Sequence, residues 1–326
     1  MDGKIERKTW TDSKFVRDKA KIPLNRNECY DKYLVGRYKI FLSQIDPMAI
    51  MLYPNLRDAY EGLRKLKVDP EFAMLCDGAE GAIRAVIEAN RDALEISIPR
   101  PTYEMVKIIS SICGLKTTDI PYDKSFKLDF NGNGICYIAN PDNCTGTLIG
   151  IEKIEDLCNQ FKVVIVDEAY YEYSGVTCVS LIGKLNNLFV IRSFSKGYGV
   201  AGIRIGAVIS CKENINNLTI NKPAYEVSSI ACEYLKFISL DLINRSVNSI
   251  LTGKKAIECY LSNRGLSVMA TNGNFVLVKF DENLARSISR FADVKVLEIS
   301  GDKYIRITSP DAETSSHLIE SGALGG

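Results

Sequence analysis

Short runs of consecutive apolar residues recur along much of the chain, and segments of helical spacing separate several of them. The runs cover residues 94–98, 134–139, 163–166, 188–191 and 203–209. Continuous apolar strands are typical of a sheet that is buried on both faces, the usual environment of parallel strands. The helical pattern over 151–161 fits this arrangement, because helices commonly connect parallel strands. The pattern therefore predicts an α/β domain with a mainly parallel sheet.

Two helices can be placed from their first residues. Asp77 and Glu80 precede the helical pattern over 81–89 with the spacing of a capping box, in which each side chain bonds a backbone N–H. Pro223 suits the first turn of a helix, where its missing N–H has no consequence. The pattern after Pro223 predicts one long helix to about residue 261. Residues 1–44 are polar and irregular at first and predict few regular elements.

The pattern changes after residue 265, which indicates a second structural unit. Strand-like segments at 274–280 and 304–308, with a helical segment between them, predict a smaller α+β domain. A length of 326 residues agrees with two domains, at roughly 100–200 residues per domain. We expect the large domain to span 45–231, and residues 1–44 and 232–326 to form an N-terminal segment plus the small domain.

Charge and histidine content narrow the possible functions. Lys and Arg number 41 and Asp and Glu 40, so a net charge of +1 gives no reason to expect nucleic acid or an anionic membrane as partner. The chain has one histidine, His317. Catalysis by a Ser–His or Cys–His pair, or by a histidine-ligated metal, is therefore close to excluded. An enzyme of this composition needs another acid–base group.

Cysteine usage and the N-terminal residues bear on location. The ten cysteines are scattered and contain no CxxC pair, so we expect neither a metal site nor a thioredoxin-type redox motif. Residues 1–8 are mostly charged, and no run approaches the roughly 18 apolar residues of a membrane span. Free thiols without a secretion signal indicate a reducing, cytoplasmic environment.

Polar motifs follow three of the predicted strands. Residues 140–146 are NPDNCTG, residues 167–170 are DEAY, and residues 193–206 are SFSKGYGVAGIRIG. Each motif alone has an ordinary structural explanation, such as a turn, a helix cap or close backbone packing. Ligands in open α/β sheets bind at the carboxyl ends of the strands. Motifs at successive strand ends therefore predict one shared site.

These motifs resemble those of the class I and II aminotransferases, enzymes of fold type I that use pyridoxal 5'-phosphate (PLP). The similarity is greatest to the histidinol-phosphate aminotransferase branch, and SxSKxxGxAGxRxG around Lys196 is its most specific motif. Weaker similarities lie at Asn27-Glu28, Tyr53-Pro54, 77–80, 101–103, Asn274-Phe275 and 305–308. The resemblance implies a mainly parallel sheet of the seven-stranded type sandwiched by helices, a smaller α+β domain, and PLP as cofactor.

The resemblance also implies the catalytic residues. Lys196 would form a Schiff base with PLP and then move the proton during amino transfer, a role that needs no histidine. Asp167 matches the aspartate that keeps the ring nitrogen protonated, so that the ring can accept electrons. Tyr170 and Asn143 match groups that hydrogen-bond the phenolic oxygen of the ring, and Tyr103 matches an aromatic residue that stacks on it.

The cofactor phosphate has its own implied ligands. They are the backbone N–H groups of Ala79 and Glu80 at a helix N-terminus and the side chains of Ser193, Ser195 and Arg204. A further ligand is Tyr53, which resembles a tyrosine that reaches the phosphate from a neighbouring subunit. The resemblance therefore implies a homodimer with shared active sites.

Substrate binding is implied at two further places. Arg306 matches an arginine that binds a substrate carboxylate with two parallel hydrogen bonds, although a surface arginine at a strand edge would fit the sequence equally well. Asn143 and Asn27 complete the set, with Asn27 in an N-terminal segment that closes over the substrate. The sequence departs from the family at several positions. Cys144 replaces a proline, and Lys295 is the cation nearest to the position of an arginine that helps to bind a substrate phosphate.

The expected function is transfer of an amino group between an amino acid, with glutamate as the first candidate, and a small carbonyl compound, with phosphate esters favoured. An alternative is decarboxylation of an O-phospho amino acid on the same scaffold, because the sequence does not show which bond at Cα is aligned for cleavage. A ligand-sensing relative that binds PLP without turnover is a third. The presence of Lys196, Asp167 and Tyr170 argues against that third alternative.

Overall fold

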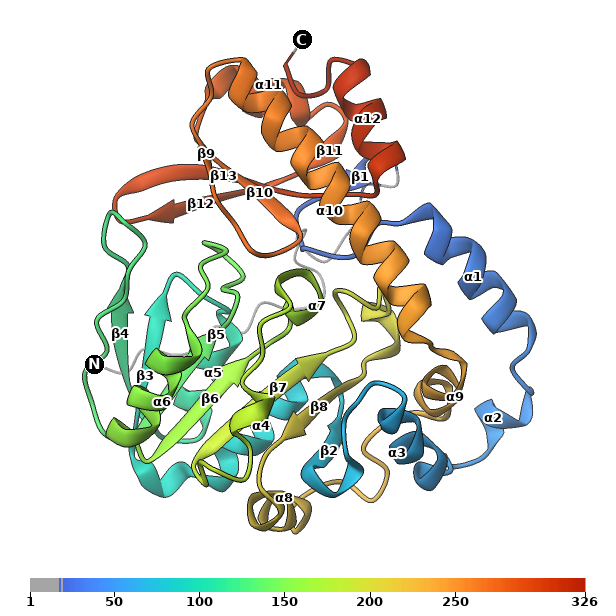
Figure 1. Cartoon of the computed structure of the whole chain (residues 1–326), viewed down its shortest axis with the longest axis vertical. Helices are drawn as coiled ribbons and strands as arrows, with labels where there is room; N and C mark the ends of the chain where they lie inside the picture. Colours follow the sequence, from blue (N-terminus) through green and yellow to red (C-terminus); the bar gives the residue numbers. More distant parts are fainter. Residues whose placement is uncertain (1–17, 19, 326) are drawn as a thin grey trace.

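A seven-stranded sheet forms the centre of the larger part of the molecule (Figure 1). The computed structural model describes residues 18 and 20–325. In spatial order the strands are β2 (Ala73–Cys76), β8 (Gly206–Ile209), β7 (Leu188–Ser193), β6 (Val163–Asp167), β5 (Ile135–Ala139), β3 (Glu95–Arg100) and β4 (Lys116–Pro121). β8 is antiparallel to both of its neighbours, and the other pairs are parallel. The predicted α/β fold with a mainly parallel sheet is confirmed.

Helices cover both faces of this sheet, as the apolar strands require. One face packs on α4 (Gly78–Ala89), α5 (Met105–Ile112) and α8 (Lys212–Thr219). The other packs on α3 (Leu56–Arg64), α6 (Ile151–Gln160), the short α7 (Tyr171–Ser174) and α9 (Ser229–Phe237). Because side chains alternate between the faces of a strand, successive residues of β6 enter different hydrophobic clusters.

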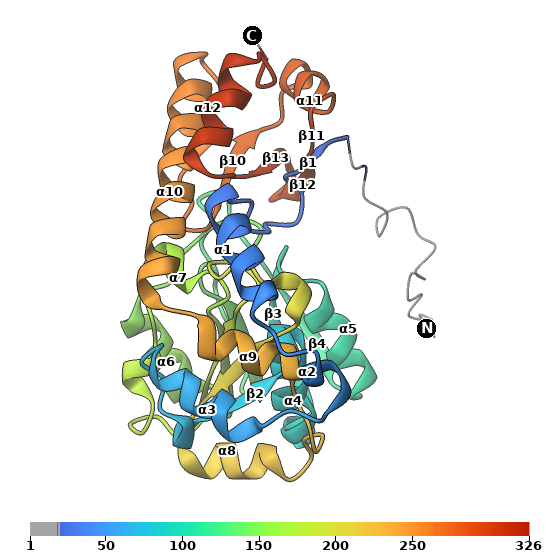
Figure 2. The same ribbon diagram turned by 90° about the vertical axis from the view of Figure 1, so that its right-hand side faces the viewer.

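The smaller unit is an antiparallel sheet with helices on it, which lies above the large sheet in Figure 2. Its strands are, in order, β12 (Lys295–Ile299), β13 (Asp302–Thr308), β10 (Phe275–Lys279) and β9 (Val268–Met269). Its helices are α11 (Glu282–Ile288) and α12 (Ala312–Glu320). The N-terminal segment joins this unit, because β1 (Ile22–Pro23) pairs in parallel with β11 (Ala292–Asp293).

The prediction of one long helix that begins at Pro223 is wrong. The structure has two helices there, α9 and α10 (Leu240–Asn263), and Pro223 precedes both. Each begins at a serine whose side chain accepts a backbone N–H, Ser228 for α9 and Ser239 for α10. Serine at an N-cap stabilises a helix start, so the second cap interrupts the run.

The N-terminal region is also more regular than predicted. The helices α1 (Lys32–Ser43) and α2 (Met48–Met51) follow β1, and Asp31 caps α1 by accepting the N–H of Tyr33. Short 3₁₀ turns occur at Pro70–Phe72, Arg91–Ala93, Val179–Leu181 and Ala201–Ile203. Across residues 18 and 20–325, none of the helices combines the length and the apolar character that crossing a bilayer requires.

The long helix α10 links the two units (Figure 1). Leu242, Val247 and Ile250 of α10 lie in a hydrophobic cluster of the large unit, whereas Ile257 and Leu261 lie in the core of the small one. The boundary that we expected at residue 231 falls inside α9, whose apolar side chains pack on the large sheet. We now propose that the two domains are divided within α10.

Candidate active site

A cavity of about 350 Å³ lies where the carboxyl ends of β5, β6 and β7 meet the small domain. It is lined by Asn25, Arg26, Asn27, Glu28, Ala79, Glu80, Tyr103, Ala139, Asn143, Asp167, Ala169, Tyr170, Ser193, Ser195, Lys196, Ala201, Arg204, Lys295 and Arg306. All of the predicted site residues except Tyr53 are among them. The fold thus gathers residues that are up to 281 positions apart (306 − 25) around one space.

Lys196 follows β7 and is held inside this cavity. Its Nζ donates a hydrogen bond to the backbone carbonyl of Arg26, at 2.9 Å. Burial, followed by the positive charge of Arg306, lowers the pKa of Lys196 to about 8. A primary amine with that pKa is partly neutral near physiological pH, as a nucleophile or a general base must be.

Asp167 ends β6 and is 5% exposed. Its Oδ1 accepts the N–H of Ala169 at 3.0 Å, and its Oδ2 accepts the hydroxyl of Tyr137 at 2.9 Å. Burial raises the pKa of Asp167 to about 6, although both hydrogen bonds and the charge of Lys196 act in the opposite direction. The carboxylate is therefore a buried negative charge at the base of the cavity.

Tyr170, Asn27 and Asn143 form one connected wall. The side-chain amide of Asn27 donates to the hydroxyl of Tyr170 at 3.0 Å and to the backbone carbonyl of Asn143 at 3.2 Å. Asn27 has a left-handed φ of 53°, is 1% exposed, and donates its backbone N–H to Thr308. Asn27 therefore ties the N-terminal segment to both domains, while its contact with a substrate stays a prediction.

The N-terminus of α4 and Arg204 form another end of the cavity. A helix leaves its first N–H groups without intrahelical acceptors, so those of Ala79 and Glu80 are available to an anion. Gly78 has φ +69°, and a Cβ there would lie 2.6 Å from Nη2 of Arg204. The glycine therefore lets the guanidinium approach this helix end. Ser193 and Ser195 lie on the same side, linked by a hydrogen bond of 3.2 Å between the N–H of Ser195 and the hydroxyl of Ser193.

The predicted capping box at this helix is wrong. Asp77 precedes α4 but its side chain caps no N–H, and it lies 3.6 Å from Nε of Arg204. Glu80 instead accepts a hydrogen bond from the hydroxyl of Tyr103, at 2.9 Å. The predicted strand over 203–209 is also too long, because Arg204 has a left-handed φ of 60° and β8 begins at residue 206.

Tyr53 is the exception among the predicted residues. It is 80% exposed and its ring stacks on that of Tyr225, with the centroids 4.3 Å apart. Both tyrosines border a neighbouring depression that also includes Asp77 and Arg204. Tyr53 therefore lies at the surface near the α4 end of the cavity, outside the cavity of its own chain.

Arg306 lies on β13 and is 4% exposed, which excludes the surface arginine that its sequence position alone allowed. Its Nη2 donates to the carbonyl of Asn25 at 2.8 Å and its Nη1 donates to the carbonyl of Asn143. Its buried Nε has no hydrogen-bond partner among the described residues. Lys295 lies opposite Arg306 on β12 and also lines the cavity.

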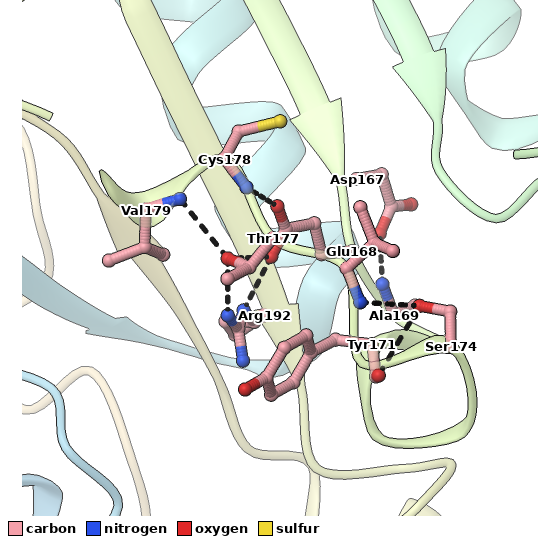
Figure 3. Close-up of polar contacts among 10 residues, drawn as sticks. Asp167, Glu168, Ala169, Tyr171, Ser174, Thr177, Cys178, Val179 and Arg192 are labelled. Carbon is pink, nitrogen blue, oxygen red and sulfur yellow. Dashed lines mark hydrogen bonds and ion pairs between the residues drawn. The ribbon is translucent and has the colours of Figure 1, made fainter. Parts of the chain in front are cut away.

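The side chain of Glu168 points away from that of Asp167 (Figure 3). It lies on the face of the large sheet where Cys178 belongs to a hydrophobic cluster. Its Oε2 lies 2.9 Å from Nε of Arg192, and it accepts hydrogen bonds from the hydroxyl of Thr177 and the N–H of Cys178. The guanidinium of Arg192 also lies 3.6 Å from the ring centroid of Tyr171. Because Arg192 is on β7, this ion pair links the strand ends that carry Asp167 and Lys196.

Comparison with known proteins assigns the family. A model described as "Aminotransferase class I and II" matches residues 50–321. The chain belongs to this family. It is an aminotransferase of fold type I, and its cofactor is PLP.

Similarities to individual proteins agree with the assignment. The aminotransferase is 28% identical to histidinol-phosphate aminotransferase 1 of Carboxydothermus hydrogenoformans, over 84% of this chain and 82% of that protein. Its structure matches that of histidinol-phosphate aminotransferase from Sinorhizobium meliloti in complex with PLP, with a TM-score of 0.74, 19% identity, and 92% and 89% of the two chains covered. It also matches L-threonine-O-3-phosphate decarboxylase from Porphyromonas gingivalis, with a TM-score of 0.72, 20% identity, and 92% and 98% covered. At these identities the two structures show the shared fold only.

The residues around the cavity fit PLP chemically. A partly neutral lysine can react with an aldehyde, and a buried carboxylate can accept a hydrogen bond from a protonated ring nitrogen. A helix N-terminus beside an arginine can bind a phosphate. Gly78 provides the space that brings the guanidinium of Arg204 close to this helix N-terminus. The sequence did not reveal Tyr137, which lies outside the cavity lining and contacts Asp167, because it lies within an apolar run that predicts only a buried strand.

Proposed function

We propose that this aminotransferase transfers an amino group between an amino acid, with glutamate as the donor, and a small phosphorylated carbonyl compound, and that Lys196 is its catalytic amine. The arrangement of Lys196 and Asp167 around one cavity carries the proposal. One is a buried amine with a pKa lowered to about 8, and the other is a buried carboxyl with a pKa raised to about 6. Charged groups with pKa values moved towards neutrality are typical of catalytic sites.

The cofactor would be held by groups from several strand ends, loops and a helix N-terminus. When bound, PLP supplies an aldehyde that reacts with amines and a ring that withdraws electrons from the substrate Cα. Asp167 would accept a hydrogen bond from the ring nitrogen. Tyr170 and Asn143 lie beside Asn27 on the wall where the phenolic oxygen would bind, and Tyr103 would lie against the ring.

The phosphate of the cofactor would bind at the α4 end of the cavity. The N–H groups of Ala79 and Glu80, the hydroxyls of Ser193 and Ser195, and the guanidinium of Arg204 are its proposed ligands. Arg204 lies beside Asp77, with its Nε 3.6 Å from Oδ1 of that residue, so it is oriented by a second charge.

Lys196 would move the proton that amino transfer requires. Its amine donates one hydrogen bond to a backbone carbonyl and forms no ion pair with a side chain among the described residues. Moving the amine towards the substrate therefore breaks only that hydrogen bond. Near neutral pH the amine holds its proton for part of the time, because its pKa is about 8. The same group can therefore take up a proton and give it back.

The small-domain side of the cavity supports an anionic substrate. Arg306 is buried, its Nε has no partner in the part of the chain that the structure describes, and Lys295 lies directly opposite it on the neighbouring strand. A guanidinium binds carboxylate with two parallel bonds, whereas an ammonium binds phosphate as a compact charge. Arg306 would take the α-carboxylate, and Lys295 is positioned to attract a second anionic group.

We further propose a homodimer with shared active sites in the cytoplasm. Apolar side chains are exposed along α1, α2 and the residues that follow, near the depression that contains Tyr53. They are Val35, Ile40, Leu42, Met48, Ile50, Met51, Leu52 and Tyr53. A cluster of this kind is typical of a protein interface, and Tyr53 would reach the phosphate of the partner's cofactor from it. Within the described residues all ten cysteines are free, as in a reducing compartment.

Decarboxylation of an O-phospho amino acid is the second candidate, and the shared fold of the threonine phosphate decarboxylase is the observation that keeps it open. The PLP-loaded enzyme is mixed with one amino acid at a time, without an acceptor, and the cofactor absorbance and released CO₂ are recorded. The aminotransferase proposal is supported if glutamate converts the aldehyde form of the cofactor stoichiometrically to the amine form, and if a phosphorylated ketone or aldehyde reverses this change. Catalytic CO₂ release from phosphothreonine or phosphoserine contradicts it.

A further inference from the structure

Tyr137 is a buried tyrosine next to the active site whose hydroxyl has one specific partner. Its side chain is fully buried in β5, and its hydroxyl donates to Oδ2 of Asp167 at 2.9 Å. A buried hydroxyl without a hydrogen bond is unfavourable, and phenylalanine would fill the same apolar space without that requirement. Packing alone therefore does not explain the hydroxyl, whose hydrogen-bond partner is the carboxylate of the active site.

The register of the sheet fixes this contact. Tyr137 is opposite Ile165, and Ala139 is opposite Asp167, so the phenol reaches the carboxylate diagonally between neighbouring strands. Tyr137 packs in the hydrophobic cluster that also contains Ile165 and Ile191. Tyr137 is not among the residues that line the cavity, so it acts on a ligand only through Asp167.

We propose that Tyr137 is a positioning residue that orients the Asp167 carboxylate towards the cofactor ring and stabilises its negative charge. The inference rests on the role that we propose for Asp167. Oδ1 is held by the N–H of Ala169 and Oδ2 by Tyr137, so the carboxylate cannot rotate without losing a bond. A carboxylate held at both oxygens can accept a further hydrogen bond in only a narrow range of directions.

The charges around Asp167 show why this hydroxyl matters. Burial favours the neutral carboxylic acid, the Tyr137 hydrogen bond is the largest opposing influence, and Lys196 and the N–H of Ala169 oppose burial as well. The nearby carboxylate of Asp142 acts in the same direction as burial. Tyr103 lies in the same cavity as a neutral phenol and adds no charge. Burial and Asp167 also raise the pKa of Tyr137 far above its ordinary value, so it remains a donor at any physiological pH.

The test is an infrared titration of the cofactor-free protein. Subtracting the spectrum of Asp167→Asn isolates the protonated-carboxyl band of Asp167 and gives the midpoint of its titration. In Tyr137→Phe we expect that midpoint to rise by about one to two pH units, the value of one hydrogen bond to a charged group. The matched control is Tyr234→Phe, which removes another fully buried tyrosine hydroxyl, bonded to Tyr38 and the carbonyl of Tyr198.

A binding cycle gives a second readout. At about pH 7 we expect Tyr137→Phe to weaken PLP binding in equilibrium dialysis by roughly tenfold, and to have no further effect in an Asp167→Asn background. An unchanged midpoint in Tyr137→Phe, an equal shift in Tyr234→Phe, or an undiminished effect without Asp167 would each overturn the inference. If Tyr137→Phe destabilises the fold, the same titration on protein containing fluorinated tyrosines, which are stronger donors, must lower the midpoint. The titration needs no cofactor, so it can fail while Asp167 still proves essential for turnover.

Discussion

Asp167 and Glu168 are adjacent buried carboxylates with opposite environments (Figure 3). Glu168 faces the hydrophobic cluster behind the sheet, 2.9 Å from Nε of Arg192, and it also accepts hydrogen bonds from Thr177 and Cys178. Asp167 faces the cavity, and the described residues that donate hydrogen bonds to it are both neutral, Tyr137 and Ala169. Burial raises the pKa of both carboxyls, but only Glu168 has a cation in contact with it among the described residues.

The difference separates a structural charge from a functional one. A buried carboxylate that is paired with a cation and hydrogen-bonded already has its charge and its acceptor oxygens matched by the protein, so it is not available to bind a ligand. One that lacks a cation is destabilising in the free protein but binds a positively charged group strongly when that group arrives. Sequence adjacency therefore conceals two roles, which follow from the alternation of side chains across β6.

The largest expected effect comes from removing the charge of Asp167 alone, which tests whether this carboxylate is the functional one of the pair. We expect Asp167→Asn to lower kcat/KM for amino transfer by about 100-fold or more, because the preorganised charge that keeps the ring nitrogen protonated is lost. The protein should remain folded by circular dichroism, and some PLP should still bind. Activity within a factor of two of the unmodified enzyme would mean that Asp167 does not stabilise the cofactor ring.

Removing the charge of its neighbour should instead affect the fold. We expect Glu168→Gln to lower the free energy of unfolding by about 3 kcal/mol, because the substitution leaves Arg192 half-buried without its counter-charge. Denaturant unfolding of the cofactor-free protein measures this change. Glu233→Gln, which breaks an exposed ion pair with Lys236, is the control and should change stability by about 0.5 kcal/mol or less. Equal losses in the two variants would contradict the structural role of Glu168.

Asp167→Asn should change stability in the opposite direction. A rise of the carboxyl pKa from 3.8 to about 6 corresponds to about 3 kcal/mol of destabilisation when the group is ionised, which is an upper value for the gain in Asp167→Asn. Because the folded protein holds this proton more tightly than the unfolded chain does, the gain should be present above pH 6 and disappear towards pH 3.8. Urea unfolding of the cofactor-free protein at several pH values would show it, and a loss of stability at neutral pH would contradict the account.

Arg306 extends the comparison to a buried cation. Like Asp167, it is a buried charged group with no counter-ion in contact among the described residues, and its Nε has no partner there in spite of two hydrogen bonds from Arg306 to backbone carbonyls. We expect Arg306→Lys to raise KM for the amino-acid donor by about tenfold with a smaller change in kcat, because an ammonium cannot bind a carboxylate with two parallel bonds. Arg286→Lys, at an exposed ion pair with Glu282, should leave both constants unchanged. A KM equal to that of the unmodified enzyme would place the substrate carboxylate elsewhere.

Five of the seven strands of the large sheet, and the residues that follow them, could be predicted from the sequence, because a strand buried on both faces is continuously apolar. The two edge strands, β2 and β4, were not predicted. The breaks in that pattern at 140, 167 and 193 mark where the chain reaches the cavity. The family motifs then assigned roles to Lys196, Asp167 and Arg204, which the structure brings together around one space.

Other features depend on contacts that one sequence does not specify. The capping box failed because Arg204 and Tyr103 compete for Asp77 and Glu80. The helix after Pro223 failed because a second serine cap interrupts an otherwise helical pattern. Tyr137 was missed because its apolar neighbours predict only a core position, and the partner of its hydroxyl is on another strand.

Borohydride trapping tests whether the amine of Lys196 carries the cofactor. The PLP-loaded enzyme is treated with borohydride, which makes the linkage permanent, and is then digested and analysed by mass spectrometry. The account predicts that the cofactor mass is found on the peptide containing Lys196 and is absent in Lys196→Ala, which should also have no amino-transfer activity. Labelling at a different lysine, or full activity in Lys196→Ala, would contradict it.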